Sequence, residues 1–523
     1  LCWLLLLSSL CIISVQNVQS AKILGVFPTS SKSHYIVGSA LMKALARKGH
    51  EVILSVIKVR IRWHDLRQFS PFPQQKPMKN YRDITTTKVW KAVEPKKNPI
   101  ESIQSTYDFG HRITNSTLTD PPVVDLIASN ETFDLIVLEI FMNDAMIGFC
   151  HHFKAPCIGM STFGASKWTA DLVGTPSPPS YVPNAFLGFS DRMSFKERLF
   201  NTLMSAMEIL VDATIDYPVQ NKIYQDAFPG PKPPLAELKK KAISLVLLNN
   251  HFSLNYPRPY VTGMIEVGGM HINRVPKPLP DNIQSFMDNA TDGVIYFSMG
   301  SNIKSKDLPI EKRDAFLKVF SKLKQKVLWK WEDDNLPGKP DNVFVQSWWP
   351  QDDILAHPNV KLFITHGGLL STTESLYHGV PVIGIPVFGD QYLNMAKAER
   401  GGYGLSVAYA EISETKLSNA IEAILNDPQF KVNALAISQR YRDQPLTPLE
   451  LATFWVEYVI RQKGAPHIRT AAMDLSFVQY HNLDVLGLLI GLPIVILHLL
   501  VRRVCRKKSS KPSNKINERK KRN

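Results

Sequence analysis

Short apolar runs alternate with longer amphipathic stretches along most of the chain. Ile23 to Phe27 is predicted to be a strand, Gly38 to Lys48 a helix, and Glu51 to Val56 the next strand. Leu135 to Leu138 and Cys157 to Met160 have the apolar character of later strands. Strands that alternate with helices indicate βαβ units, so this part of the chain is predicted to form a parallel sheet covered by helices.

A second alternating series starts near residue 293 and predicts another parallel sheet. Pro257 to Asp281, between the two series, is rich in proline and glycine and is the predicted interdomain linker. The pattern indicates an α/β protein with two doubly wound, Rossmann-like domains, in which ligands bind at the carboxyl ends of the strands. The predicted elements of the second series are strands at Val294 to Phe297, Lys326 to Lys330, Val343 to Gln346, Leu362 to Ile364 and Val382 to Ile385, and helices at Ile310 to Leu323 and Thr372 to His378.

The first residues differ from both series because Leu1 to Ile13 is almost wholly apolar. Val18 and Ser20 place small residues at the −3 and −1 positions of a cleavage site before Ala21. This arrangement is typical of a secretory signal peptide, which we expect to occupy residues 1–20.

Another long apolar run, Leu483 to Val501, has about the length needed to cross a bilayer. Basic residues follow from Arg502 onward, and Lys and Arg mark the cytosolic side of a span. The predicted topology is single-pass type I, with residues 21 to about 482 luminal, a membrane helix at 483–501 in the lipid bilayer and a basic cytosolic tail at 502–523. The final Lys520-Lys521-Arg522-Asn523 resembles a di-lysine retrieval signal, which predicts the endoplasmic reticulum membrane.

The net charge of the chain does not change the predicted domain organisation and membrane topology. The chain has a formal net charge of +15, but its last 22 residues hold eleven Lys or Arg and a single acid, Glu518. The basic excess therefore belongs mostly to the tail and not to a groove on a domain, so we predict no nucleic-acid partner.

Cysteine and histidine placement predicts no metal site. Of five cysteines, only Cys150 and Cys157 lie between the predicted signal peptide and the tail, and a disulfide and two buried thiols fit them equally well. No Cys/His cluster has zinc spacing, and no Asp-x-Asp pair is placed to hold a metal on a diphosphate. Sequons at Asn115, Asn130 and Asn289 are compatible with luminal exposure.

The densest chemistry lies between Ser347 and Gln391. The predicted strand Leu362 to Ile364 runs into a His-Gly-Gly turn at His366, and Ser371 and Thr372 are predicted to cap the following helix. A glycine-rich turn at a helix N-terminus favours an anion such as a diphosphate. The other polar and aromatic groups of the segment are suited to a base, a ribose and a sugar; they are Trp348, Glu374, Asp390 and Gln391.

Together these residues resemble the signature of the UDP-glycosyltransferase family, especially its insect form. Trp348, Ser371, Glu374 and Asp390 stand 18, 5, 8 and 24 residues from His366, and the resemblance runs from Lys22 through the apolar C-terminal run. It implies a GT-B architecture, with an N-terminal acceptor-binding domain at 21–265 and a C-terminal UDP-sugar-binding domain at 266–475.

The family's residues carry over by position. The resemblance implies that Trp348 stacks on uracil, that Gln351 contacts the nucleoside, that Glu374 binds the ribose, and that the diphosphate and sugar are bound by Ser301, His366, Gly368, Ser371, Asp390 and Gln391. Leu370 stands where several relatives have Asn, so a polar contact from that side chain is absent here.

The resemblance also implies a catalytic base, His34, in the segment after the first strand. A neutral imidazole near pH 7 can accept the proton of an acceptor hydroxyl, although a loop or capping role for His34 is the simpler reading of the residue alone. The family pairs this histidine with an acid. Glu139 ends the strand at the matching position, and Asp144 follows in an Asn-Asp pattern; we slightly favour Asp144.

The implied reaction is inverting transfer of a hexosyl group from a UDP-sugar to a hydroxyl of small lipophilic acceptors, for detoxification or conjugation, without a metal. UDP-glucose is the favoured donor, with UDP-glucuronate as the second candidate. A non-catalytic UDP-sugar-binding membrane protein and a nucleotide-sugar epimerase are the alternatives, and a homo-oligomer is left open. Apolar residues that suit such acceptors include Phe141, Phe149, Phe163 and Trp168.

Overall fold

The computed structural model of the chain describes residues 20–29, 31–56, 59–62, 99–301, 303–333 and 335–509. The chain forms two compact units, Leu1–Arg469 and Thr470–Asn523, which are described separately below. The predicted signal peptide and the end of the tail, with its di-lysine motif, lie outside the described residues.

The N-terminal half of the first unit is built on a seven-stranded sheet in the order β3-β2-β1-β4-β5-β6-β7. All neighbours pair in parallel except β2 and β3, which are antiparallel. The first series of predicted strands is therefore confirmed. The strands are β1 (Lys22–Phe27), β2 (Glu51–Val56), β3 (Val59–Arg62), β4 (Leu135–Glu139), β5 (Cys157–Ser161), β6 (Ile243–Leu248) and β7 (Met264–Glu266).

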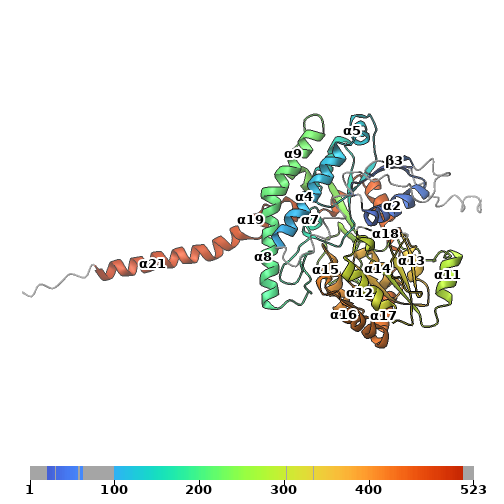
Figure 1. Cartoon of the computed structure of the whole chain (residues 1–523). Helices are drawn as coiled ribbons and strands as arrows, with labels where there is room; N and C mark the ends of the chain where they lie inside the picture. The colour runs from blue at the N-terminus through green and yellow to red at the C-terminus, as the bar shows by residue number, and fades with distance from the viewer. Residues whose placement is uncertain are drawn as a thin grey trace, which may run out of the picture. The chain divides into compact units, whose positions relative to one another are not determined.

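Helices pack around this sheet, and α4, α8 and α9 are labelled in Figure 1. Helix α9 contacts α4, and a π-helical turn, η3, joins α8 to α9. The helical segments are α2 (Lys32–Arg47), α4 (Pro99–Leu118), α5 (Pro121–Ala128), η2 (Asp144–Ile147), α6 (Gly148–His152), α7 (Lys167–Ala170), α8 (Phe195–Val211), η3 (Asp212–Asp216), α9 (Tyr217–Ala227) and α10 (Leu235–Lys241).

The C-terminal half holds a six-stranded, fully parallel sheet in the order β10-β9-β8-β11-β12-β13, as the second series predicts. Its strands are β8 (Val294–Ser298), β9 (Lys326–Lys330), β10 (Val343–Gln346), β11 (Val360–Thr365), β12 (Val382–Gly384) and β13 (Gly404–Ser406). Its helices include α11 (Asp281–Asp288), α12 (Ile310–Phe320), α13 (Gln351–Leu355), α14 (Leu369–Tyr377), α15 (Gln391–Arg400), α16 (Glu414–Asn426), α17 (Pro428–Arg442) and α18 (Pro448–Arg461).

Three predicted boundaries need correction. Helix α2 begins at Lys32 and not at Gly38, because its first turn is polar and the apolar periodicity starts only at Val37. Helix α14 begins at Leu369, with Gly368 as its N-cap, so Ser371 lies inside the first turn and does not cap it. The predicted linker contains β7, which pairs with β6 and so belongs to the N-terminal sheet.

Helix α18 returns to the N-terminal half and packs against α2. Val37 and Leu41 of α2 share a buried apolar cluster with Val456 and Val459 of α18. Leu370, where several relatives have Asn, packs at the edge of the same cluster. Helix α2, which carries His34, is thus packed against a helix from the C-terminal end of the first unit.

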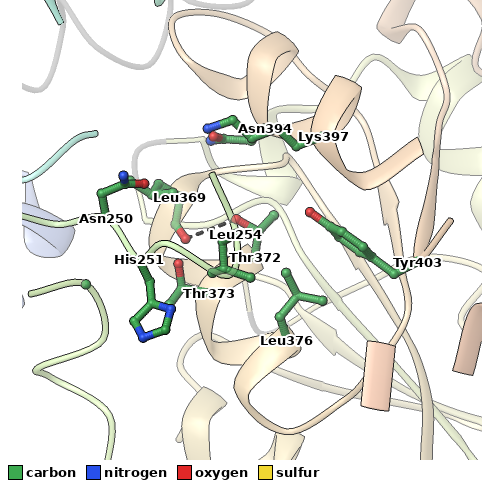
Figure 2. Close-up of a pocket in the computed structure, with 11 residues that line it drawn as sticks. Asn250, His251, Leu254, Leu369, Thr372, Thr373, Leu376, Asn394, Lys397 and Tyr403 are labelled. Carbon is green, nitrogen blue, oxygen red and sulfur yellow. Dashed lines mark hydrogen bonds between the residues drawn. The ribbon is translucent and has the colours of Figure 1, made fainter. Parts of the chain in front are cut away.

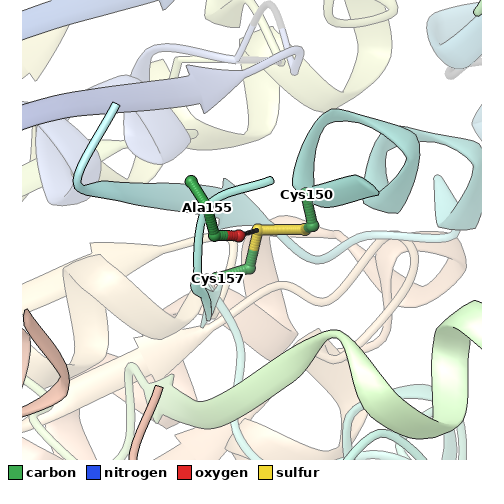
Figure 3. The surroundings of a disulfide bond; sticks show 3 residues. All are labelled: Cys150, Ala155 and Cys157. Carbon is green, nitrogen blue, oxygen red and sulfur yellow. Dashed lines mark hydrogen bonds between the residues drawn. A yellow bond between two sulfur atoms is a disulfide. The ribbon is translucent and has the colours of Figure 1, made fainter. Parts of the chain in front are cut away.

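Cys150 and Cys157 form a disulfide that ties α6 to the start of β5, which decides between the two alternatives left by the sequence (Figure 3). Both cysteines are buried. The asparagines of the three sequons, Asn115, Asn130 and Asn289, are exposed.

The second unit is helical and contains α21 (Leu492–Ser509). Among the described residues, Leu483–Arg503 is the one helical stretch long and apolar enough to cross a membrane, with a mean hydropathy of 2.4 and no part of it buried. It coincides with the predicted span at 483–501, on the grounds of length and composition.

Candidate active site

Both sheets reverse their strand order at a topological switch point, and the predicted site residues follow the strands on either side of these points. In the N-terminal sheet, β1 leads to the turn that carries His34, and its neighbour β4 ends at Glu139. In the C-terminal sheet, β8 leads to Gly300 and its neighbour β11 leads to His366. Parallel α/β sheets bind ligands at such points, because the connections leave on opposite sides and open a crevice.

His34 lies in the first turn of α2 and its side chain is buried beside Glu139. Nδ1 of His34 is hydrogen-bonded to Glu139 Oε1 and lies 3.0 Å from Thr162 Oγ1. The other oxygen of Glu139, Oε2, accepts from the backbone N–H of Thr29 at 3.0 Å. Among the described residues, both hydrogen bonds of the imidazole involve Nδ1, so Nε2 is left to meet a substrate hydroxyl.

The preference for Asp144 as the partner of His34 is wrong in this structure. Asp144 forms an ion pair with Lys239 of α10 and, with Asp212 and Asp216, belongs to an acid–lysine cluster, the name used here for these four residues. Burial alone would lower the pKa of Lys239, but the charges of Asp144 and Asp212 raise it. Asp144 therefore compensates a lysine, and Glu139 contacts the histidine.

The Asn-Asp pattern still has a structural role through its asparagine. Asn143 donates to the carbonyl of Glu139 at 2.9 Å and accepts from the N–H of Phe141 at 2.8 Å. Gln220 of α9 braces the same turn by donating to the carbonyl of Met142 at 2.8 Å. These bonds fix the end of β4, and hence Glu139, in a turn where Met142 has a φ of 51°.

Aromatic rings flank His34. Phe141 and Phe163 approach the imidazole edge-on, with ring centroids at 5.5 and 5.3 Å, and stack on each other at 5.1 Å. Phe149, by contrast, is fully buried in the core against Phe228. Of the aromatic residues noted in the sequence, Phe141 and Phe163 are thus the two that adjoin His34.

On the C-terminal side, His366 fits between two glycines. A Cβ atom on Gly300 would lie 2.4 Å from Cε1 of the imidazole, and one on Gly368 would lie 2.4 Å from Nε2. Burial, with a contribution from the charge of Lys330, lowers the pKa of His366 to about 4. His366 is therefore neutral near pH 7 and offers one N–H to an anion at the N-terminus of α14.

A hydrogen-bonded network joins the predicted nucleoside contacts. Gln351 donates to Glu374 Oε2 at 2.7 Å and to Ser371 Oγ at 3.1 Å. Nε2 of His271 lies 3.0 Å from Glu374 Oε1. Glu374 is thus held by two partners. One of them, His271, was not selected from the sequence because it lies in the predicted linker.

The predicted sugar contacts lie at the start of α15. Gln391 accepts from the N–H groups of Val387 and Phe388, at 2.7 and 3.1 Å, so its NH₂ group is the part suited to a ligand. Asp390 accepts from Asn394 at 2.9 Å. Burial raises the pKa of Asp390, while this hydrogen bond and the charges of Lys397 and His34 oppose the rise.

Two predicted contacts lie at the surface. Ser301 follows Gly300 and is exposed. Trp348 is 39% exposed, and Nζ of Lys32 lies 3.5 Å from its ring centroid. Lys32 was not selected from the sequence, although it stands two residues before His34.

A pocket adjoins this site between the two halves (Figure 2). Figure 2 shows Asn394 and Lys397 of α15 side by side, with Asn250 and His251 of the N-terminal half on another wall. Burial lowers the pKa of Lys397 to about 8, against the charges of Asp390 and Glu266. The remaining lining residues are Leu254, Gly268, Leu369, Thr372, Thr373, Leu376 and Tyr403.

Among the described residues, the carboxylates of the acid–lysine cluster are the only group of three or more acidic, His or Cys side chains close enough to share a metal ion. The Lys239 ammonium already pairs with Asp144 there. The cluster belongs to the N-terminal half and contains none of the predicted donor contacts.

Two Rossmann-like sheets with site residues at both switch points define the GT-B class of glycosyltransferases. Solved structures of similar fold include the calicheamicin glycosyltransferase CalG4, with a TM-score of 0.55 and 15% identity over 85% of this chain and 99% of that chain. The spinosyn forosaminyltransferase SpnP is similar, with a TM-score of 0.54 and 14% identity over 85% of this chain and 100% of that chain. At these identities the likeness concerns the fold.

Sequence comparison is more specific. Residues 21–521 match the family described as "UDP-glucoronosyl and UDP-glucosyl transferase". "UDP-glycosyltransferase UGT5" of Dactylopius coccus is 39% identical over 92% of this chain and 91% of its own length. Human "UDP-glucuronosyltransferase 1A9" is 31% identical over 89% and 88%. The chain belongs to the UDP-glycosyltransferase family, and it is an enzyme that transfers a sugar from a UDP-sugar to an acceptor.

Proposed function

We propose that this enzyme transfers a hexosyl group from UDP-glucose to the hydroxyl of a small lipophilic acceptor, with inversion at the anomeric carbon. The observation that carries the proposal is the pair of His34 and buried Glu139 at the N-terminal switch point, while Asp390 is the N-cap residue of α15 in the C-terminal half. The base and the sugar contacts therefore come from different halves and act on the same reacting centre.

His34 is the catalytic base of the proposed reaction. With Nδ1–H donating to Glu139, the neutral imidazole has its lone pair on Nε2. Nε2 takes the proton of the acceptor hydroxyl while the oxygen bonds to the anomeric carbon, and the bond from that carbon to the UDP oxygen breaks. Glu139 holds the tautomer and stabilises the imidazolium, the role that an aspartate has in hydrolase triads.

The departing diphosphate is stabilised by the chain itself. The N–H groups at the start of α14, the N–H of neutral His366 and the hydroxyl of Ser371 are the proposed donors. Because these groups supply the electrostatic stabilisation, turnover is proposed to be independent of metal ions. EDTA should leave the rate unchanged, and a loss that manganese restores would contradict this part.

The acceptor is proposed to be small and largely apolar, such as a phenol. Phe141 and Phe163 form aromatic walls beside His34, and apolar ligands gain from burial against such surfaces. UDP-glucose is the proposed donor because a relative from Dactylopius coccus is named "UDP-glucosyltransferase 2", and UDP-glucuronate is the second candidate. We further propose conjugation of such compounds, as in detoxification, on the luminal side of the endoplasmic reticulum membrane, with Leu483–Arg503 as the anchor.

Acceptor-dependent release of UDP tests this proposal. The full chain should release UDP from UDP-glucose when a panel of phenols is added, and His34→Ala should abolish the acceptor-dependent part while UDP still binds. Mass spectrometry of the product formed from mixed UDP-sugars identifies the donor. Release of UDP that does not depend on any acceptor, or full activity in His34→Ala, would refute the proposed mechanism.

A further inference from the structure

Lys32 connects the two halves at the proposed nucleotide site. It is the first residue of α2, and its Nζ lies 3.5 Å from the ring centroid of Trp348, which follows β10 in the other half. An ammonium this close to an indole face is attracted by the negative potential of the ring. The contact therefore covers the face of Trp348 on which Lys32 lies.

The same indole is the ring on which uracil stacks according to the family resemblance. A base stacks at about the van der Waals distance from an aromatic ring, so a base and an ammonium cannot occupy one face together. If uracil uses the face that Lys32 covers, the ammonium has to leave it when the donor binds. The inference therefore rests on the proposed function and on the stacking of uracil on Trp348 that the family resemblance implies.

The charges near Lys32 determine which position of its ammonium group is electrostatically most favourable. Lys330, at the end of β9, is 6% exposed and forms an ion pair with Glu332. Burial and the charge of Lys330 together lower the pKa of Lys32, and the charge of Lys330 also contributes to the lowered pKa of His366. Lys32 thus lies in an electrostatically positive neighbourhood, where an anion relieves the repulsion between the two ammonium groups.

A UDP-sugar brings such an anion to this neighbourhood. With uracil on Trp348 and the sugar at Asp390, the diphosphate lies between them, at His366 and the N-terminus of α14. A lysine side chain has a flexible four-carbon stem and three N–H donors, so its ammonium can exchange a ring face for a phosphate oxygen that comes within its reach.

We propose that Lys32 is a positioning residue that passes from Trp348 to the diphosphate when the donor binds, and that this movement makes nucleotide binding depend on the diphosphate. In the empty enzyme the ammonium covers the uracil platform. In the donor complex it pairs with the diphosphate, and the first turn of α2, which carries His34, is thereby fixed against the donor.

The test compares two ligands on the full chain in detergent, measured by calorimetry. In Lys32→Met, which keeps the length and loses the charge, UDP affinity should fall by about tenfold to a hundredfold, because a charge-assisted contact is lost. Affinity for uridine, which has no phosphate, should stay the same or rise by up to about tenfold, because the competing cation–π contact is gone. Lys32→Arg should restore UDP binding, and the salt dependence of UDP binding should be weaker in Lys32→Met.

Lys43→Met, eleven residues further along the same helix, is the matched control and should leave both affinities unchanged. Equal losses for UDP and uridine in Lys32→Met would indicate damage to the fold, and unchanged affinities for both would indicate that Lys32 meets no phosphate; either result overturns the inference. Failure of the unmodified enzyme to bind UDP would instead refute the proposed function on which the inference rests.

Discussion

The two halves of the first unit assemble their functional groups in different ways. The C-terminal half takes its proposed donor contacts almost entirely from one stretch, Ser347 to Gln391, in which each contact follows the end of a strand or lies in the first turns of a helix. The N-terminal half collects the surroundings of His34 from separate segments: Thr29 after β1, Glu139 at the end of β4, and Thr162 after β5.

This difference separates two kinds of constraint. A site drawn from one stretch depends on local backbone geometry, such as the glycines around His366. A site drawn from separate strands depends on the order and register of the sheet, which brings Glu139 to His34 across 105 positions of sequence. The buried groups that support each half should therefore respond differently to substitution.

The largest effect is expected at the long-range pair. Glu139→Gln should lower kcat by on the order of 10³-fold with little change in KM for the donor, because an amide neither fixes the tautomer of His34 nor stabilises its cation. Steady-state kinetics with a phenol acceptor measure this loss of kcat and the KM for the donor.

Asp144→Asn is the matched change five residues later. It removes the partner of the partly buried Lys239 and so should lower the thermal midpoint, while kcat of the folded enzyme changes less than tenfold. Equal losses of kcat in Glu139→Gln and Asp144→Asn would mean that Glu139 does not act specifically through His34.

In the C-terminal half, Gly368→Ala tests local geometry without backbone strain, since the φ of Gly368 is −64°. The added Cβ would lie 2.4 Å from Nε2 of His366, so the imidazole has to shift. UDP affinity should fall on the order of 10- to 100-fold, as expected when a contact is misplaced by about 1 Å. In Gly263→Ala the new Cβ meets ordinary contacts of 3.5 Å or more, and UDP affinity should not change. A normal affinity in Gly368→Ala would show that His366 does not contact the nucleotide.

The next prediction concerns how the stability of the N-terminal half depends on pH. Burial raises the pKa of Glu208, whose side chain accepts a hydrogen bond from Asn184, to about 7. Between its ordinary value and pH 7 the folded protein holds a proton that the unfolded chain has lost, so the contribution of Glu208 to stability decreases as pH rises through this window. Glu208→Gln should therefore raise the free energy of unfolding at pH 8 by about 3 kcal/mol and have little effect near pH 4.

Thermal unfolding of the Glu208→Gln variant from pH 4 to 8 measures this difference. Glu422→Gln, on the exposed surface of α16, is the control and should follow the unmodified protein at every pH. A constant offset between Glu208→Gln and the unmodified protein would contradict a role for titration.

The smallest effect is expected for the disulfide that closes the short segment before β5. Replacing both Cys150 and Cys157 by Ser should lower the free energy of unfolding by about 2 kcal/mol, as estimated for a loop of this length. Because β5 leads directly to Thr162, kcat measures whether the strand end moves. We expect kcat to stay within about twofold, and a collapse of kcat without unfolding would mean that the disulfide positions the base.

Much of the fold was predictable because apolar periodicity records which faces are buried. The two series of strands and the two doubly wound domains follow from local pattern, and the GT-B class and the donor segment follow from the family resemblance of residues at fixed spacing. The predicted start of α2 was wrong because its first turn is polar. The predicted start of α14 was wrong because Ser371 and Thr372 were interpreted as caps, whereas the N-cap is Gly368. β7 was missed because three residues within a proline- and glycine-rich stretch carry almost no pattern.

The sequence by itself therefore determined the family, the architecture and the residues proposed to hold the donor, since these depend on residues at fixed separations along the chain. Only the tertiary structure decided that Glu139 partners His34 while Asp144 partners Lys239, and that Cys150 and Cys157 are joined. It also brought Lys32 onto Trp348, a contact between segments more than 300 positions apart. Distances between such segments are set by strand order and helix packing, which no local spacing in the chain specifies.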